Sequence, residues 1–153
     1  MSATPTPPPS VALEHRRRHL PAERRSVTKK LTISYLDYDA PQCADGSQPP
    51  LREIDLYIIV GLYEDGTPGE LFVEAGKTGA MVSGLLEAFG IAVSIALQSG
   101  VELAWFTSKL KGMSFEPAGA TSDPRIRSAR SIIDGVARWL EIRFLGGGDV
   151  SAQ

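Results

Sequence analysis

The sequence predicts a single α+β domain in which a small antiparallel sheet of about three strands packs against about three helices. Two stretches alternate apolar and polar residues with the two-residue period of strands, and a turn containing glycine and proline separates two of the predicted strands. In the second half of the chain, apolar residues recur at the helical spacings of three and four. A chain of 153 residues can bury one ordinary core, so we expect one domain.

The two ends of the chain lack the composition of a folded domain. Prolines and small polar residues fill residues 1–10 and offer little apolar surface to offset the entropy of ordering. Three glycines, Gly146 to Gly148, precede a short polar tail. We therefore predict a disordered proline-rich and basic arm over residues 1–17, a domain over residues 18–145 and a flexible tail over residues 146–153.

Three strands are predicted in the first half of the chain. Residues 31–36 alternate apolar and polar side chains, and residues 54–62 are apolar on both faces, which is typical of an interior strand. Residues 37–53 contain several prolines and little periodicity, which predicts a long loop. Residues 64–69 supply glycine and proline for a reversal, and residues 71–75 return as the third strand.

Three helices are predicted to follow the strands. The first covers residues 79–98, with Thr78 as its cap and Gly100 closing it, and its apolar composition predicts that it is mostly buried. The second covers residues 101–110. The third begins at Asp123-Pro124, a favourable helix start, and continues to about residue 144, with Arg130, Asp134 and Arg138 on its outer side.

Charge and cysteine content exclude several classes of protein. A formal charge of −2 does not fit a surface that binds nucleic acid or anionic lipid as a whole, so such contacts must be local. The single cysteine, Cys43, cannot form an internal disulfide, which favours a cytoplasmic location over a secreted scaffold. The longest apolar stretch, residues 89–97, is shorter than the roughly 20 residues that cross a bilayer, so we expect no membrane association.

One predicted binding site lies where the third strand meets the first helix. Lys77, Thr78 and Gly79 occupy the place where a phosphate-binding loop puts its lysine and hydroxyl, so we predict weak nucleotide or anion binding there. The complete loop requires a glycine five residues before Gly76, where this chain has Leu71. Hydrolysis of nucleoside triphosphates is therefore not expected, and a capped helix start is the simpler interpretation.

A second predicted contact site is the basic segment that precedes the first strand. It is expected to contact a protein partner or a polyanion through five arginines, Arg16, Arg17, Arg18, Arg24 and Arg25. The segment lacks interleaved aromatic residues, so nucleic-acid binding would be weak and salt-dependent, and a charged linker is the alternative. His15 and His19 have no third ligand, so no metal site is predicted. No catalytic residue is predicted, because no histidine outside this segment could serve as a base.

Several blocks of sequence resemble the small C-terminal domain of adenosylcobalamin-dependent (class II) ribonucleotide reductases, the TSCPD domain. The resemblance covers roughly residues 18–145. It is carried by five ordered blocks: residues 18–28 with Leu-Pro-x-Glu-Arg-x-Ser-x-Thr, residues 60–72, residues 82–101, residues 115–119 and residues 131–140. The motif that gives the domain its name reads Thr121-Ser122-Asp123-Pro124-Arg125 here, so its cysteine is absent and no thiol or metal role of that cysteine is implied.

The resemblance implies that the chain takes part in ribonucleotide reduction, a reaction that it cannot catalyse alone. The family replaces a ribose hydroxyl by hydrogen, using a radical from the cobalamin cofactor, an active-site thiyl and a pair of reducing cysteines within a large barrel. One cysteine and 153 residues cannot supply these parts. We therefore expect the chain to bind no cofactor by itself, with adenosylcobalamin entering only through a partner reductase.

Three functions remain open from the sequence. The first is an accessory or regulatory component that docks on the large subunit of the reductase and supports deoxyribonucleotide supply for DNA synthesis. Its expected contact segments are residues 16–30, residues 64–69 and residues 115–119. The second is an autonomous module that binds a nucleotide or nucleic acid through Lys77, Thr78 and the basic segment. The third is a homo-oligomer that forms through the apolar helices.

Overall fold

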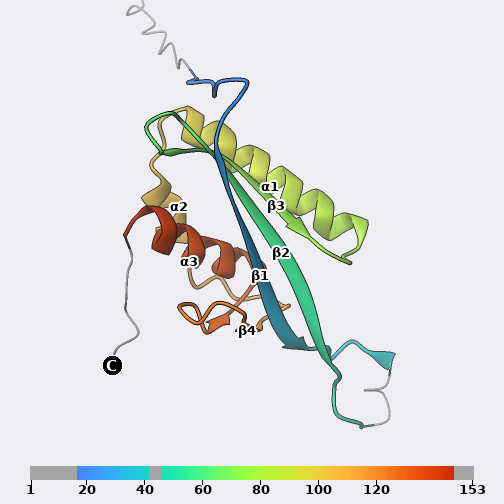
Figure 1. Ribbon diagram of the computed structural model, residues 1–153. Coiled ribbons are helices and arrows are strands. Elements are labelled where there is room, and N and C mark those ends of the chain that lie inside the picture. The colour runs from blue at the N-terminus through green and yellow to red at the C-terminus, as the bar shows by residue number, and fades with distance from the viewer. Residues whose placement is uncertain (1–16, 42–45, 147–153) are drawn as a thin grey trace, which may run out of the picture.

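The computed structural model describes residues 17–41 and 46–146 (Figure 1). Most of the predicted N-terminal arm with His15 and Arg16, the loop that carries Cys43, and the tail from residue 147 onward lie outside the described residues.

The described part of the chain is an α+β domain, as the sequence predicts. Its five strands form one antiparallel sheet in the order β3-β2-β1-β4-β5. They are β1 (Ser26–Leu36), β2 (Leu51–Leu62), β3 (Pro68–Ala75), β4 (Gly119–Thr121) and β5 (Ser128–Ala129). The two strands beyond the three expected ones are short. Strand β5 lies within the predicted third helix, and β4 lies just before the predicted start of that helix.

The long pair β1–β2 forms the middle of the sheet. Its register runs without interruption from the Ser26–Gly61 pair to the Leu36–Leu51 pair. Alternation places Leu31 and Ile33 of β1 on the helix-covered face, where both are fully buried. Strand β2 lies between β1 and β3, which confirms its predicted interior position. It begins at Leu51, so the predicted loop is shorter than expected.

The hairpin from β2 to β3 follows the predicted reversal. The Tyr63 amide donates to the carbonyl of Thr67, and the Gly66 amide donates to the carbonyl of Tyr63. Gly66 has φ = +83°, a conformation that side chains other than glycine rarely adopt. The Asp65 carboxylate accepts hydrogen bonds from both the amide and the hydroxyl of Thr67, which fixes the turn.

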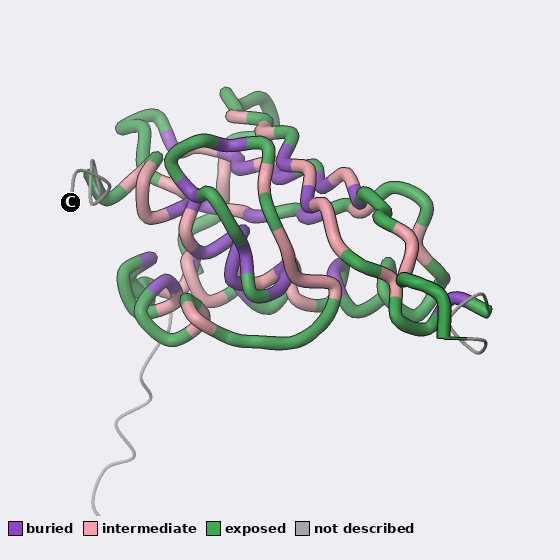
Figure 2. The backbone as a smooth tube through the Cα atoms, turned by 90° about the horizontal axis from the view of Figure 1, so that it is seen from below, coloured by how far each residue is buried: buried purple, intermediate pink, exposed green. Residues whose placement is uncertain are grey.

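Three helices complete the domain: α1 (Ala80–Gln98), α2 (Leu103–Leu110) and α3 (Ile132–Phe144). Helix α1 runs beside β3 at one edge of the sheet. Helices α2 and α3 lie together toward the other edge, beyond the long β1–β2 pair (Figure 1). Figure 2 shows the buried residues concentrated where strands meet helices. The core combines the inner face of the sheet with Leu86 and Val93 of α1, Leu103 of α2, and Val136 and Trp139 of α3.

Helix α1 is far more exposed than the sequence predicts. Its buried residues are Leu86, Gly90, Val93 and Gln98. The reason is that α1 lies along β3, the edge strand, and contacts it through a narrow face that includes polar residues. The Ser94 hydroxyl bonds the amide and carbonyl of Leu71. The expectation of a mostly buried helix is therefore wrong.

The exposure of α1 also bears on whether this helix could cross a membrane. Among the described residues, α1 is long and apolar enough to cross a bilayer by length and composition, and 17% of its apolar window is buried. The apolar stretch from residue 89 to 97 is only part of this helix, which is 19 residues long. In the structure, one face of α1 is hydrogen-bonded to β3, so the helix forms part of the domain.

The third helix begins later than predicted. It starts at Ile132, after an N-cap at Ser131 whose hydroxyl accepts from the Asp134 amide. The predicted start, Asp123-Pro124, opens a turn instead, because Arg127 takes the left-handed conformation with φ = +54°. That residue ends the turn, and its carbonyl accepts from the Thr121 amide before β5 begins. The predicted start at Asp123 is therefore wrong.

The position of Asp134 is also corrected by the structure. Its side chain is fully buried rather than on the outer side of the helix. Its two oxygens accept from the amides of Gly112 and Arg130, and from Nε of Arg138 at 2.8 Å. Asp134 therefore joins the end of α2, the β5–α3 connection and α3.

Candidate functional site

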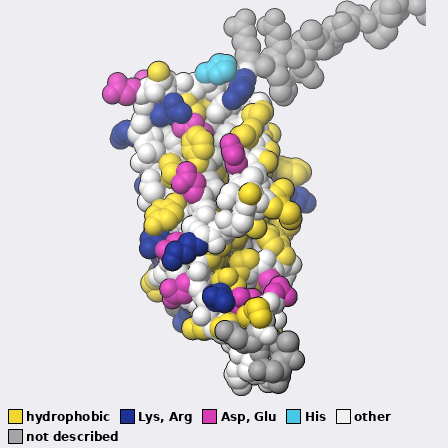
Figure 3. Space-filling model, turned by 90° about the vertical axis from the view of Figure 1, so that its right-hand side faces the viewer, with side chains coloured by type: hydrophobic (Ala, Val, Ile, Leu, Met, Phe, Trp, Pro, Cys, Tyr) yellow, Lys and Arg dark blue, Asp and Glu magenta, His cyan; other side chains and the backbone are white. Residues whose placement is uncertain are grey.

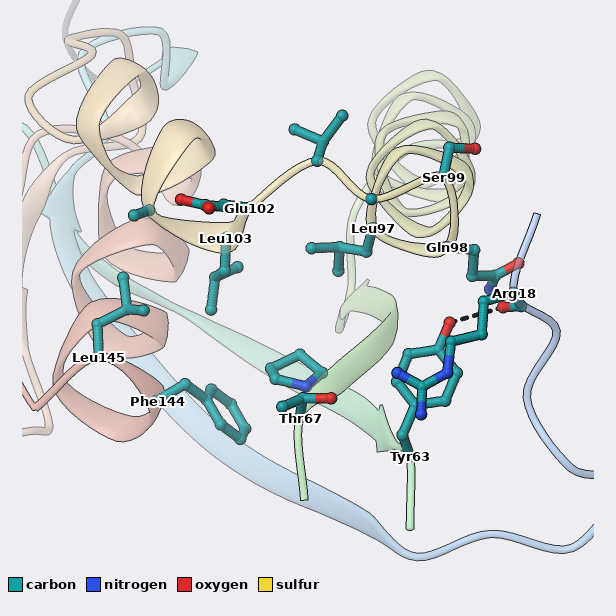
Figure 4. Close-up of a pocket in the computed structure, with 14 residues that line it drawn as sticks. Arg18, Tyr63, Thr67, Leu97, Gln98, Ser99, Glu102, Leu103, Phe144 and Leu145 are labelled. Carbon is teal, nitrogen blue, oxygen red and sulfur yellow. Dashed lines mark hydrogen bonds between the residues drawn. The ribbon is translucent and has the colours of Figure 1, made fainter. Parts of the chain in front are cut away.

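A pocket lies where the hairpin turn, the end of α1, the start of α2 and the end of α3 meet (Figure 4). Its volume is about 570 Å³, which is within the range of small-molecule and peptide-side-chain sites. The lining residues come from distant parts of the chain: Arg18, Tyr63, Thr67, Pro68, Leu97, Gln98, Ser99, Gly100, Val101, Glu102, Leu103, Ala104, Phe144 and Leu145. The fold therefore builds this pocket from segments that the sequence separates widely.

Arg18 and Tyr63 form the cationic wall of the pocket. The Arg18 guanidinium lies 3.9 Å from the centre of the Tyr63 ring, a favourable cation–π distance. The Tyr63 hydroxyl donates to the carbonyl of Arg18 at 2.6 Å (Figure 4). Arg18 also lies 3.8 Å from the carboxylate of Asp65 in the hairpin turn, in a solvent-exposed pair. The guanidinium is thus held at the pocket while most of its surface remains available to a partner.

Gln98, the last residue of α1, fixes the entry of the N-terminal segment. Its side chain is buried, and its Nε2 donates to the carbonyl of Gly69 at 2.9 Å. Its Oε1 accepts from Nε of Arg17 at 2.6 Å, and its backbone carbonyl accepts from the Arg18 amide at 2.7 Å. One residue therefore links the basic segment, the start of β3 and the end of α1.

The remaining walls of the pocket are mainly apolar. They include Leu97, Val101, Leu103, Phe144 and Leu145. The residues described as lining the pocket include neither histidine nor cysteine, the side chains that most often act as base or nucleophile near neutral pH. An apolar wall beside a guanidinium is suited to binding an amphipathic group.

The structure assigns internal roles to most of the predicted arginines. Arg17 bonds Gln98, Arg18 stacks on Tyr63, and Arg24 forms a two-pronged pair with Glu70 in which Nη2 lies 2.7 Å from Oε2. Arg25 contributes its backbone carbonyl to the amide of Leu62. The segment from residue 17 to 25 is thereby fixed along the sheet, and only Arg17 and Arg18 of this group lie at or beside the pocket. Polyanion binding through these arginines stays a prediction.

Lys77, Thr78 and Gly79 lie together in the connection from β3 to α1, away from the pocket. Thr78 does not cap the helix, because the N-cap is Gly79, and the Thr78 hydroxyl bonds the Ala75 carbonyl and the Ser83 hydroxyl instead. Lys77 has φ = +58°. Its charge contributes to lowering the pKa of Asp55, after the larger contributions of Thr32 and Lys30. Anion binding by these residues stays a prediction.

The loop that resembles the TSCPD motif carries a network of charges. Asp123 is buried and accepts from Arg125, with Nη2 at 2.8 Å from Oδ2, and from the Arg125 amide at 3.0 Å. Nζ of Lys29 on β1 lies 3.0 Å from the same carboxylate. The hydrogen bonds from Arg125, followed by Lys29, hold the pKa of Asp123 well below its usual range. The Asp123 carboxylate, which pairs with Arg125 of the same loop and with Lys29 of β1, therefore occupies the position that is cysteine in the TSCPD motif.

Replacement of Asp123 by asparagine is expected to make the free energy of unfolding less dependent on pH between pH 7 and pH 3. A lowered folded-state pKa stabilises the protein above the unfolded pKa of about 3.9, and this contribution is lost as the pH falls below that value. The variant should be less stable by about 1–3 kcal/mol at pH 7, with a smaller difference at pH 3. Urea unfolding at both pH values measures this, with exposed Glu23→Gln as the control. An equal difference at both pH values would contradict the assignment.

Within residues 17–41 and 46–146, no group of three or more His, Cys, Asp or Glu side chains is arranged to hold a metal ion.

Sequence reasoning missed Tyr63 and Gln98, the two residues that build the pocket wall with Arg18. Tyr63 directly follows the predicted second strand and Gln98 is the last residue of the predicted first helix, and neither position by itself indicates a pocket. A weak signal existed for Gln98, because a polar residue at the end of an apolar helix often satisfies backbone groups of a neighbouring element. The contact partners, Gly69 and Arg17, are far away in sequence and could not be identified from spacing.

Comparison with known proteins places the chain in a family. The TSCPD domain model matches residues 17–144. The chain is 39% identical over 141 residues to the vitamin B12-dependent ribonucleotide reductase of Rhodopirellula baltica, covering 92% of the chain and 12% of the relative. The enzymes of the same name from Streptomyces clavuligerus and Agrobacterium fabrum are 37% and 32% identical over 84% and 88% of the chain. No solved structure matches.

The chain thus spans about 12% of the length of the first two relatives. The matched region contains the sheet, the three helices and the pocket, from the arginines at its start to Phe144. The domain match and the identity to these reductases show that the chain belongs to the TSCPD domain family.

Proposed function

We propose that this chain is an accessory or regulatory component of a vitamin B12-dependent ribonucleotide reductase, and that it supports deoxyribonucleotide supply for DNA synthesis by docking on the large catalytic subunit. The observation that carries the proposal is the match itself. Nearly the whole chain corresponds to about one eighth of a reductase that is named for its B12 dependence. In the relatives this region is covalently part of the enzyme, so a chain with the same fold is expected to bind the same surroundings.

The pocket beside Arg18 is the proposed docking site. Two of the three segments expected to contact the reductase, the basic segment and the hairpin turn, meet at this pocket. The third, residues 115–119, lies with Tyr35 and Asp37 at a separate hollow. An exposed guanidinium beside apolar side chains fits a segment of the partner that presents an apolar residue next to a carboxylate.

The corrinoid cofactor is not assigned to this chain. The pocket of about 570 Å³ is in the size range of sites for drug-sized groups. We propose that the partner reductase holds the adenosylcobalamin.

The docking proposal is tested by capture of the reductase from the source cell with the tagged full-length chain. We expect the captured polypeptide to be identified by mass spectrometry as the B12-dependent reductase. Val101 lines the pocket and is 41% exposed, so Val101→Glu should reduce the captured amount at least tenfold, or about 1.4 kcal/mol in binding free energy. Leu51→Glu places the same charge on an exposed leucine at the opposite end of β2 and serves as the control.

Two outcomes of this experiment would count against the proposal. If repeated capture experiments did not recover the reductase, the reductase would be excluded as the partner of this chain. If Val101→Glu and Leu51→Glu captured equal amounts of the reductase, the pocket would be excluded as the docking site, while the reductase would still be the partner.

A further inference from the structure

The outer face of α1 is an uncharged apolar surface that the rest of the described chain leaves uncovered. Five large side chains on this helix are exposed by 36 to 75%: Met81, Val82, Leu85, Ile91 and Ile95. The only charged residue of α1 is Glu87, which lies beside β3 in a hollow shared with Phe72 and Ile91. Figure 3 shows the side of the molecule on which α1 and β3 lie, with patches of hydrophobic side chains next to charged ones.

Small residues run along the middle of this face with a spacing of four. They form one row on the helix: Ala80, Gly84, Ala88, Ala92 and Ala96. Residues four apart form continuous ridges on a helix surface, so a row of small residues forms a groove. The groove is bordered by Met81 and Leu85 on one side and by Ile91 and Ile95 on the other.

From this surface we infer that two copies of the chain associate through α1, with the helices crossing about a twofold axis. In such a contact the ridge of Ile91 and Ile95 from each copy lies in the small-residue groove of the other, which is the commonest class of helix packing. A twofold contact brings identical surfaces together, and it requires that no like charges meet. Apart from Glu87, which begins the ridge of Ile91 and Ile95 beside β3, the side chains of this face carry no charge.

The size of the surface sets the expected strength of the dimer. A helix of nineteen residues is about 28 Å long and about 11 Å across, so half of its lateral surface is about 480 Å². Phe72 on β3, which is 47% exposed, extends the surface beside Ile91. Standard stable interfaces bury about 800 Å² on each partner. The area therefore fits a weak dimer with a dissociation constant on the order of 10 µM.

The first test is sedimentation velocity of the full-length chain from about 1 to 300 µM. We expect the weight-average mass to rise from one copy to two across this range. Ala92→Glu places a charge in the groove at an exposed position, so it should raise the dissociation constant at least tenfold. Ser108→Glu introduces the same charge on an exposed residue of α2, and its dissociation constant should equal that of the parent chain.

The second test uses cross-linking and does not depend on dissociation of the dimer. Ala88 lies near the middle of the groove, so its counterpart in the other copy comes close at the crossing. A bismaleimide should link Ala88→Cys at least tenfold faster than Ser108→Cys, with the parent chain and its Cys43 as the background.

Three results would overturn the inference. They are a single-copy mass at 300 µM, equal cross-linking of the two cysteine variants, and flotation of the chain with phosphatidylcholine vesicles without dimer formation, which would assign the face to a bilayer. The experiments use the purified chain alone. Their failure therefore leaves the reductase proposal standing, and loss of the reductase partner leaves the dimer standing.

Discussion

Replacement of Asp134 by alanine is expected to lower the free energy of unfolding by about 3–5 kcal/mol, because the amides of Gly112 and Arg130 and the guanidinium of Arg138 lose their shared acceptor. The carboxylate is fully buried and accepts from the amides of Gly112 and Arg130 and from Nε of Arg138. Alanine leaves these two part-buried amides without their acceptor, and an amide that loses its partner costs up to about 1–3 kcal/mol. The loss also separates α2 from α3.

Urea unfolding followed by circular dichroism measures this effect, and Arg138→Ala is its control. The Arg138 side chain is 36% exposed, and Asp134 keeps its two amide donors when this partner is removed, so Arg138→Ala should cost less than Asp134→Ala, about 1–2 kcal/mol. Asp134→Asn keeps one oxygen acceptor and should fall between the two variants. A loss below 1 kcal/mol for Asp134→Ala would show that the two amides find other partners, and the proposed role of Asp134 in joining the helices would be wrong.

Replacement of Gly90 by valine is expected to destabilise the domain by about 1–3 kcal/mol. Helix α1 crosses β3 at this glycine, and a Cβ atom placed there would lie 2.7 Å from the backbone carbonyl oxygen of Leu71. The neighbour is backbone rather than a flexible side chain. The helix must therefore move away from the edge strand, and the two hydrogen bonds between Ser94 and Leu71 weaken with it.

The matched comparison is Gly84→Ala on the same helix. A Cβ atom at Gly84 meets nothing within 4 Å. Alanine should therefore stabilise the domain by about 0.5–1 kcal/mol, because it raises helix propensity without a clash. Thermal unfolding of the two variants should shift the midpoint in opposite directions. Shifts of the same sign would contradict the close approach of α1 to β3.

The fold class was predictable because its main signals are local. Alternation in β1 and β2 places Leu31, Ile33 and Leu56 in the core, and the turn around Gly66 needs only glycine and a short polar loop. These features depend on neighbours in sequence. The period of apolar residues therefore identified both long strands and all three helices, with errors mainly at their ends.

The errors arose where long-range contacts override local preference. Asp123-Pro124 has the residues of a helix start, yet Asp123 is held by Lys29 of β1, and Arg127 turns the chain into β5. Ser131 and Asp134 are three apart, the spacing at which a cap residue meets the first turn, and this signal was available but not used. The exposure of α1 was not predictable, because apolar composition does not specify which element covers a helix.

The candidate site was only partly predictable for the same reason. The basic segment pointed to Arg18, but its partners Tyr63 and Gln98 come from elements that meet only in the folded domain. Arg24 and Asp123 illustrate the opposite case. Their charges suggested surface contacts or a capped helix, and the fold uses them for internal pairing with Glu70 and with Arg125 and Lys29.

The measurement that tests the account most directly is ribonucleotide reduction by the purified B12-dependent reductase of the source cell, with and without the purified full-length chain. We expect the chain alone, with adenosylcobalamin and dithiothreitol, to give no deoxyribonucleotide. Added to the reductase, it should change the rate of reduction in a saturable way, and Val101→Glu should shift the half-saturating concentration upward at least tenfold. Turnover by the chain alone, or a reductase rate that stays constant at saturating chain, would contradict the account.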